Sequence, residues 1–226
     1  MLLIAAAVAT LAFAKVREYG LEPAPRPEAD CPGEPCRATG RVTGFQTRNV
    51  RDGKAIRYPT EVRRNGWLVG FSVTLGRPNK SQRTFFDRLW GKPAKAGVSV
   101  LRPAPTRKYP GNAIHRYELV AKSRVFPLNE WFDTKAWFAI GKRIYVKRKD
   151  VIALTIPTWA PVLATDRSKR ERWRGSRKFG RCNDVTPHAE HERSGSAKRY
   201  RCLYTTARLL YTALVVDLPR PAKRNR

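Results

Sequence analysis

The sequence predicts an all-β fold: a two-sheet antiparallel β-sandwich, jelly-roll-like, with one short helix. About eight short segments have strand patterns, turn residues separate these segments, and only one segment has helical spacing. A jelly roll suits that number of strands. No repeat with a period of roughly 20 to 50 residues is present, which argues against a propeller or a solenoid.

The first fourteen residues are typical of a secretion signal. The run from Leu2 to Ala14 carries no charge and ends in Ala12-Phe13-Ala14, a small-x-small pattern that signal peptidases cleave. The alternative is a membrane anchor, but spanning a bilayer requires about 20 apolar residues and this run is shorter. We therefore expect residues 1–14 to be a cleaved signal peptide, and the mature protein to be secreted or associated with the cell envelope, without a transmembrane span.

Three segments are expected after the signal. Residues 15–40 are predicted to be a Pro-rich leader, because they contain five prolines and a tight turn from Cys31 to Cys36 but no apolar periodicity. The β-sandwich domain is expected over residues 41–218. Residues 219–226 are basic and interrupted by proline, which predicts a disordered tail.

The clearest strand is the stretch GWLVGFSVTL at residues 66–75, which alternates with a period of two. The Gly-Arg-Pro-Asn that follows it ends the strand. The alternation predicts one core-facing set: Trp67, Val69, Phe71, Val73 and Leu75. Further strands are expected at residues 42–47, 98–101, 114–121, 136–140, 144–146, 151–156 and 200–216, the last with a break near Arg208.

Some patterns allow finer predictions. Both alternating sets of residues 209–216 are apolar, which is typical of a strand covered on both faces or at the centre of a sheet. Trp137 lies in a strand pattern and is expected in the core. The one helical pattern is SQRTFFDRLWG at residues 81–91, which spaces its apolar residues three to four apart after Ser81 as the expected cap.

Trp159 lies in the stretch DVIALTIPTWAP, residues 150–161, between two prolines. Pro157 and Pro161 fix φ and bar further sheet pairing, so the ring is expected at an edge of the sandwich. There it either closes the end of the core or offers a platform to a ligand. We predict that it closes the core, because burial is the commoner use of a large aromatic side chain.

The cysteines form an even set in a chain expected outside the cytoplasm, which favours two disulfides over free thiols. The four residues are Cys31, Cys36, Cys182 and Cys202. Three pairings are open, and we favour the two short-range ones, Cys31 with Cys36 and Cys182 with Cys202.

A zinc site is the alternative for the second cysteine pair. Its ligands would be Cys182, His188, His191 and Cys202. The spacing matches no compact zinc module, and oxidation competes with thiolate ligation outside the cytoplasm. We therefore predict neither a metal nor any other cofactor.

The charge balance points to acidic partners. Lys and Arg outnumber Asp and Glu by 46 to 18, which gives a net charge of +28. Such a charge concerns partners and solubility rather than fold. An exported protein this basic meets acidic polysaccharides or other polyanions of the cell envelope, or extracellular nucleic acid, which it would bind non-specifically. The alternative is a diffuse, solvated surface that forms no site.

No motif in the chain identifies a reaction. A Gly-x-Ser-x-Gly elbow, a His-Glu-x-x-His helix and a phosphate-binding glycine loop are all missing from the sequence. The stretch from His188 to His191 has the wrong spacing for a zinc protease. A glycosidase needs two carboxylates across a cleft, and Glu118 is the one carboxylate inside a confidently predicted strand. A binding protein is therefore favoured over an enzyme, and we name no catalytic residue.

The strongest candidate for a binding segment is RSKRERWRGSRK, residues 167–178. It surrounds one tryptophan with seven Lys or Arg and one Glu. An aromatic ring in a cationic loop adds stacking to charge attraction, which is typical of a polyanion contact. The expected ligand-binding residues are Arg170, Arg172, Trp173, Arg174, Arg177 and Lys178.

The order of these features resembles that of a known type of protein. A basic spacer, the stretch IYVKRKDVIALTIPTWAP, a Cys-bearing loop and the closing CLYTTARLLYTALVV are similar to uncharacterised exported β-sandwich proteins of high-GC Gram-positive bacteria. The resemblance runs from Cys31 to Val216 and implies a fold and an extracellular setting, but no binding residues. In jelly-roll modules the turn before such a strand commonly reads Gly-Asp. Here it reads Lys149-Asp150, which is not expected to adopt a left-handed conformation freely.

These patterns predict an exported, non-catalytic β-sandwich module that binds acidic cell-envelope polymers or carbohydrate. A polysaccharide hydrolase and an extracellular nucleic-acid-binding protein are the alternatives. Carboxylates clustered in a concave face would favour the hydrolase, whereas a basic stripe with exposed aromatic rings would favour polyanion binding.

Overall fold

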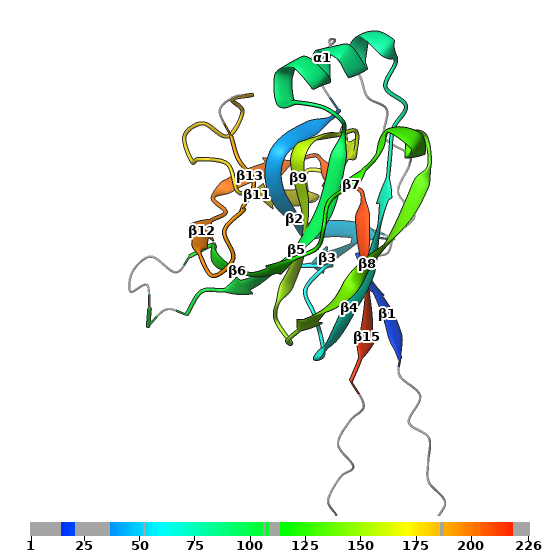
Figure 1. The fold of residues 1–226 in the computed structure, drawn as a ribbon. Coiled ribbons are helices and arrows are strands. Elements are labelled where there is room, and N and C mark those ends of the chain that lie inside the picture. The colour runs from blue at the N-terminus through cyan, green and yellow to red at the C-terminus, as the bar shows by residue number, and fades with distance from the viewer. Residues whose placement is uncertain are drawn as a thin grey trace, which may run out of the picture.

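The computed structural model describes residues 15–20, 37–51, 53–105, 107–108, 114–185 and 188–218 (Figure 1). It is an all-β fold with one α-helix, as predicted. The strands are β1 (Val16–Tyr19), β2 (Thr39–Arg51), β3 (Lys54–Arg57), β4 (Gly66–Thr74), β5 (Lys95–Pro103), β6 (Arg116–Lys122), β7 (Phe126–Pro127), β8 (Lys135–Val146), β9 (Val151–Ala160), β10 (Leu163–Ala164), β11 (Arg172–Gly175), β12 (Ala197–Arg199), β13 (Cys202–Thr205), β14 (Arg208–Leu209) and β15 (Tyr211–Asp217). The helices are α1 (Lys80–Trp90) and the short 3-10 helix η1 (Asn129–Trp131).

The paired strands are antiparallel and form two main sheets. The smaller sheet has the order β1-β15-β4-β8. The larger has the order β12-β6-β5-β9-β2-β11-β13, with β3 paired to β2 and β7 to β5, while β10 and β14 form a separate pair. The sheets curl toward each other as an open half-barrel, with α1 across one end and the free ends of β1 and β15 at the other (Figure 1).

The main core lies between the two sheets. Val42 of β2 and Ile152 of β9 are fully buried there, as are Leu68 of β4 and Val215 of β15. A second apolar cluster covers the other face of the larger sheet and contains Phe45, Leu101, Tyr117, Leu119, Val151, Ala153 and Tyr200. Because apolar groups cover both faces of β9, nearly every residue of that strand is buried.

The alternation predicted for residues 66–75 changes phase inside β4. Leu68 is fully buried, whereas Trp67 and Val69 are half-buried, and Phe71 is buried again. The pairing of β4 shifts between Leu68 and Gly70 on both sides, against β15 and against β8. A one-residue irregularity reverses the faces of everything beyond it. The prediction that Trp67 and Val69 share the core face is therefore wrong.

Trp137 is also outside the core, contrary to expectation. Its side chain is 46 % exposed, and the Nζ atom of Lys135 lies 4.8 Å from its ring centroid. The buried set of β8 is the other one, which includes Ala136, Phe138 and Ile140. Both alternating sets of this stretch are apolar, so periodicity alone could not select the buried one.

The strand β15 is an inner strand of its sheet, between β1 and β4, which confirms one of the two predicted explanations of its apolar pattern. The core covers only one of its faces. Ala213 and Val215 are fully buried, while Leu214 and Val216 are half-buried.

The helix α1 matches the predicted segment, but Ser81 is not its cap. Asn79 takes that position: its Oδ1 atom accepts a hydrogen bond of 2.9 Å from the backbone N–H of Gln82. The Gln82 Oε1 atom accepts one of 2.9 Å from the backbone of Asn79, which completes a capping box. The Ser81 hydroxyl donates to Asn79 Oδ1 at 2.7 Å and so supports the cap.

Trp159 closes the end of the core, as predicted. Its side chain has no exposed surface, and its Nε1–H donates to Asp87 Oδ1 of α1 at 2.8 Å. Its ring lies 4.9 Å from that of Phe86. Pro157 does not end the strand, however, because Trp159 still pairs with Gly40 of β2. The tryptophan therefore fastens α1 to β9.

The turn between β8 and β9 contains a left-handed residue, contrary to expectation. Lys149 has a φ of 74°. The neighbouring Asp150 carboxylate accepts hydrogen bonds of 2.8 Å from the Lys147 backbone and from both Nε and Nη2 of Arg102. The backbone N–H of Lys149 donates to Val62 at 2.8 Å. These contacts hold a conformation that is unfavourable for a residue with a Cβ atom.

The N-terminal predictions meet the structure only in part. Residues 16–19, in the segment expected to be a leader, form β1 and pair with β15, and β2 already begins at Thr39. The expected signal peptide, the Cys31–Cys36 pair and the expected tail at 219–226 lie outside the described residues.

Candidate anion-binding cleft

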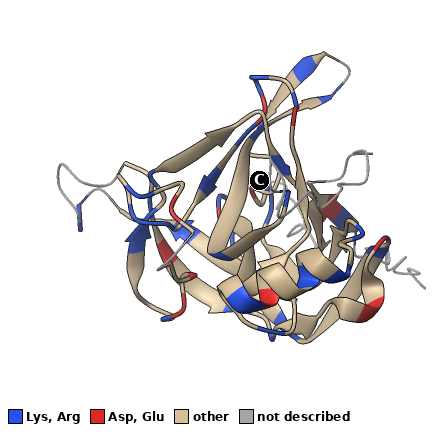
Figure 2. Ribbon diagram, turned by 90° about the horizontal axis from the view of Figure 1, so that it is seen from above, with Lys and Arg blue, Asp and Glu red and all other residues tan. Residues whose placement is uncertain are grey.

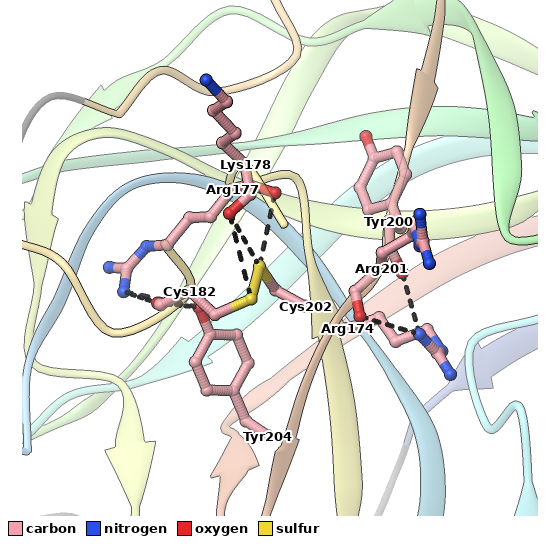
Figure 3. Close-up of a disulfide and its surroundings, with 8 residues drawn as sticks. All are labelled: Arg174, Arg177, Lys178, Cys182, Tyr200, Arg201, Cys202 and Tyr204. Atoms are coloured by element: carbon pink, nitrogen blue, oxygen red, sulfur yellow. Dashed lines mark hydrogen bonds between the residues drawn. A yellow bond between two sulfur atoms is a disulfide. The ribbon is translucent and has the colours of Figure 1, made fainter. Parts of the chain in front are cut away.

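A disulfide closes the segment that follows β11. Cys182 and Cys202 are bonded, with 2.07 Å between the sulfur atoms and 5.4 Å between the Cα atoms, which confirms the predicted pair. The carbonyl oxygens of Arg177 and Lys178 lie 3.4 and 3.5 Å from the Cys202 sulfur (Figure 3). The bridge therefore ties the chain after β11 to the start of β13.

The same bridge excludes the zinc alternative, because both of its sulfur ligands are consumed. The proposed histidine ligand His191 is buried, and its ring nitrogens lie 3.0 Å from the Tyr200 hydroxyl and 3.0 Å from Ser196 Oγ. Burial lowers the pKa of His191 to about 4. Over the part of the chain that the structure describes, no group of three or more His, Cys, Asp or Glu could hold a metal ion.

Arg177 is the structural anchor of this region. Its Nη2 atom donates to Thr39 Oγ1 at 3.2 Å and to the carbonyl of Gly40 at 3.1 Å, both on β2. Its Nη1 atom donates to the carbonyl of Cys182 at 3.2 Å. The guanidinium thus joins the larger sheet to the disulfide-closed segment, while its Nε atom is buried with no hydrogen-bond partner in the structure.

Beside the disulfide is a cleft of about 560 Å³, which we term the anion cleft. Its lining residues are Ser176, Arg177, Lys178, Phe179, His188, Ala189, Lys198, Arg199 and Arg201. Five of them are Lys or Arg, and none of the described lining residues is Asp or Glu. Cations from two segments therefore face one space without carboxylates between them, which raises the local concentration of anions.

The cations of the cleft differ in how free they are. The Lys198 Nζ atom donates to the carbonyl oxygens of Ala189 and Glu190, at 3.1 and 3.4 Å. Burial lowers the pKa of Lys198, although the charges of nearby glutamates act the other way. The side chains of Lys178 and Arg199, by contrast, make no hydrogen bond or ion pair with any described residue. They are available to a ligand.

Phe179 gives the cleft an exposed aromatic ring. Its side chain is 59 % exposed, and the guanidinium carbon of Arg201 lies 4.1 Å from its ring centroid. A guanidinium stacked on a ring keeps its edge N–H groups free to bond anionic oxygens. The exposed ring among cations is Phe179, whereas the sequence singled out Trp173 for that role.

His188 lines the cleft from a buried position. It is 8 % exposed, and its Nε2 atom has no hydrogen-bond partner in the structure. Burial lowers the pKa of His188, and the charge of Arg177 lowers it further, whereas a hydrogen bond with the Asp184 backbone raises it. The imidazole is therefore neutral at pH 7 and surrounded by positive charge.

The predicted binding residues do not all reach this cleft. Arg172 and Arg174 lie on one face of β11 and Trp173 on the other, where its ring is 2 % exposed and stacks on Tyr204 at 4.1 Å. Residues 172–175 thus form a strand within the sheet rather than an exposed cationic loop. Arg170 lies outside this strand, and its Nη1 donates to the carbonyl of Gly53 at 3.0 Å.

Arg174 already has protein partners. Its Nη1 atom donates to the carbonyls of Tyr200 and Arg201, at 3.0 and 3.3 Å (Figure 3). Burial lowers its pKa. Of the residues predicted to bind a ligand, only Arg177 and Lys178 line the anion cleft.

The acidic residue of the predicted segment is buried in the fold. Glu171 is 1 % exposed and accepts hydrogen bonds from Arg208, and it pairs with Arg167 at 3.3 Å. Arg167 of the segment and Arg208 of β14 therefore neutralise this buried carboxylate, which stabilises the junction of β11 and β14. The seven Lys or Arg of residues 167–178 are therefore not all free to bind a ligand.

Sequence reasoning missed half of the cleft. Lys198 and Arg199 belong to β12, and Arg201 directly precedes β13. The pairing of β12 with β6 and the disulfide bring these residues beside residues 176–179. Their clustering in AKRYRC was a signal in the sequence. Phe179 and His188 carried no signal that sets them apart from other loop residues.

Positive charge alone does not mark the site. Lys and Arg are spread over most of the ribbon, and Asp and Glu are few (Figure 2). A hollow of about 620 Å³ between residues 121–124 and 140–144 also gathers four Lys or Arg from two segments. What distinguishes the anion cleft from it is the exposed ring of Phe179 and the buried imidazole of His188 among the cations. Among the described helices, none is long and apolar enough to cross a bilayer.

Comparisons of the chain with protein-family models, with curated proteins and with solved structures gave no significant match.

Proposed function

We propose that this protein is an exported binding module for acidic polymers, and that the anion cleft is where it binds them. The observation that carries the proposal is the set of five Lys or Arg that line one cleft with no carboxylate among the described lining residues. A cleft of this kind attracts phosphate, sulfate or carboxylate groups and releases their counterions.

The character of the lining favours binding over bond cleavage. Hydrolysis of a polysaccharide needs a pair of carboxylates across the cleft, one of them as general acid. The described lining offers cations, one neutral imidazole and an aromatic ring instead. Free Lys178 and Arg199 side chains and the stacked Arg201 suit repeated anionic groups along a polymer.

Two features support export. The uncharged run from Leu2 to Ala14 has the pattern of a signal peptide. The disulfide between Cys182 and Cys202 is of a kind that persists in oxidising compartments. The mature secreted protein should begin at Lys15, which N-terminal sequencing of protein from the culture medium would test.

The binding proposal is tested by the salt dependence of affinity, with duplex DNA and a sulfated polysaccharide as probe polyanions. The variant replaces Lys178, Arg199 and Arg201 together with Ala. Because each contact to a DNA phosphate contributes about 0.9 to the slope of log affinity against log salt, the slope should flatten by roughly 2 to 3. The matched control replaces Lys54, Lys80 and Lys147, which are exposed elsewhere and carry the same charge.

The two variants separate a site from a diffuse surface. If the cleft binds the polymer, only the cleft variant flattens the slope. If both variants lower affinity equally, the net charge attracts polyanions without a site and the proposal is wrong.

A further inference from the structure

A second pocket adjoins the anion cleft. It has a volume of about 660 Å³ and shares Arg177 with the cleft, so the two hollows lie on either side of that side chain. We term it the tryptophan pocket. Its described lining includes Trp90, Asp166, Trp173, Arg177, Asn183 and Thr205.

The chemistry of this pocket differs from that of the cleft. The rings of Trp90 and Trp173 lie beneath the pocket almost completely buried, and its accessible apolar surface comes from Val185, Leu203 and Tyr204. Its rim carries neutral hydrogen-bonding groups, such as the exposed side chains of Asn183 and Thr205. Arg177 is the only Lys or Arg in its described lining. Such a mixture suits a sugar ring, which presents apolar C–H faces and a rim of hydroxyl groups.

The carboxylate of Asp166 on the rim of the tryptophan pocket also favours a carbohydrate ligand. Asp166 is exposed and pairs with Arg37 at 3.0 Å. A carboxylate accepts hydrogen bonds from sugar hydroxyls but repels phosphates. A nucleic-acid strand, with a charge at every unit, would meet that repulsion, whereas a polysaccharide with uncharged rings between its anionic groups would not.

The floor also holds an unsatisfied donor. The Nε1–H of Trp173 is buried and has no hydrogen-bond partner, although the ring is held by stacking on Tyr204. The Nε atom of Arg177, between the two hollows, is likewise unpaired. Buried N–H groups without acceptors are unfavourable, and an opening of the lining that admitted ligand oxygen atoms to them would remove that cost.

From this juxtaposition we infer that the two hollows form one groove for an acidic polysaccharide. Its sugar rings occupy the tryptophan pocket, its anionic substituents occupy the anion cleft, and Arg177 lies at the junction. The inference rests on the proposed function and narrows its ligand class from any polyanion to anionic carbohydrate.

The test compares a hyaluronan oligosaccharide, in which uncharged rings alternate with carboxylate-bearing rings, with a DNA oligonucleotide of equal charge, by calorimetry at one salt concentration. The pocket variant replaces Asn183 and Thr205, both exposed, with Ala and Val. Loss of their hydrogen bonds should weaken oligosaccharide binding about tenfold and change DNA binding less than about twofold. The cleft variant at Lys178, Arg199 and Arg201 should weaken both ligands.

The outcomes are distinguishable. If the pocket variant binds the oligosaccharide as the parent does, or if it loses both ligands equally, the carbohydrate groove is wrong while binding at the cleft stands. If the parent binds DNA as tightly as the oligosaccharide, the ligand class is wrong. If the cleft variant loses neither ligand, the proposed function itself fails. Unchanged circular dichroism spectra, and Tm values no lower than that of the parent, ensure that lost binding is not lost folding.

Discussion

His188 should make polyanion binding depend on pH. Its imidazole is neutral at pH 7, because burial and Arg177 lower its pKa, with Arg181 adding to the effect and Asp184 opposing it. A bound anion favours the imidazolium and so raises this pKa in the complex. The complex then holds more protons than the free protein, and affinity must rise as pH falls.

The expected rise is about threefold to tenfold between roughly pH 7.5 and 5.5, since one pKa unit corresponds to about a tenfold change. Binding of a sulfated polysaccharide, whose own charge is constant over this range, is the measurement. His188→Gln should remove the rise, whereas His191→Gln should keep it, because His191 titrates near pH 4. A rise that persists in His188→Gln would show that another group is responsible.

Lys149 offers a test of backbone strain. Its φ of 74° is unfavourable for a residue with a Cβ atom, by about 1 to 2 kcal/mol. Lys149→Gly removes that strain but adds freedom to the unfolded chain, at a cost of about 0.4 to 1 kcal/mol. We expect a net gain of about 0.5 to 1 kcal/mol in the free energy of unfolding in urea.

The matched control is Lys149→Ala, which removes the charge and keeps the strain. It should leave the unfolding free energy within about 0.5 kcal/mol of the parent, as for ordinary surface substitutions. Equal stabilisation by Gly and Ala would mean that the charge of Lys149, and not its conformation, is unfavourable.

At the scale of elements, the disulfide should matter for both stability and binding. It joins residues 20 apart in sequence and connects the chain after β11 to β13. Replacing Cys182 and Cys202 together with Ser should lower the free energy of unfolding by roughly 3 kcal/mol in the chain-entropy model. Because the bridge positions Lys178 and Phe179 opposite Arg201, polyanion affinity should fall as well.

The readouts are urea unfolding and the salt slope of DNA binding, with the reduced parent as the control for the substitutions. Reduction of the disulfide in the parent and replacement of both cysteines with Ser should weaken DNA binding to the same degree. Full affinity in a folded double Ser variant would show that the hydrogen bonds of Arg177 alone hold the cleft in shape.

Some elements follow from sequence and others do not, for identifiable reasons. The helix α1 and the burial of Trp159 were predictable, because the spacing of apolar residues and the positions of prolines are local signals. The faces of β4 were not, because the irregularity at Val69 depends on pairing with two neighbours. The face of Trp137 was hidden because its strand is apolar on both sides. The sequence predicted a loop at Trp173, because its charged neighbours gave no apolar alternation, although residues 172–175 form a strand.

The anion cleft could likewise be predicted from the sequence only in part. Cys182 and Cys202 were paired correctly from sequence, and the basic segment was located within a few residues of the cleft. The partners on the other wall depend on the pairing of β12 with β6, which brings together segments about 80 residues apart. No local pattern in the chain encodes that contact.

At the scale of the whole molecule, the charge should make stability depend on salt. The chain carries a net charge of +28. Repulsion among like charges destabilises a compact state, and salt shortens its range, from about 10 Å at 0.1 M to about 3 Å at 1 M. The Tm should therefore rise with NaCl, and a polyanion that binds the folded state should raise it at far lower concentrations.

Differential scanning fluorimetry over a NaCl series tests this, with sucrose as the uncharged additive for comparison. The cleft variant without Lys178, Arg199 and Arg201 should have a higher Tm at low salt than the parent, because it carries less of the repulsion. A Tm that falls as NaCl is added would mean that attractive ion pairs, such as that of Arg208 with Glu171, outweigh the repulsion.

The residues that line the anion cleft lie close together in the chain. All of its described lining falls between residues 176 and 201, in the segment that follows β11 and in the edge strand β12 up to the residue before β13. The main core draws on none of these residues. The lining of the cleft and the main core therefore come from separate stretches of the sequence. Exchanging residues 178–190 for another loop of similar length, with Arg177, Cys182 and β12 kept, should change the lining of the cleft while the two sheets stay intact.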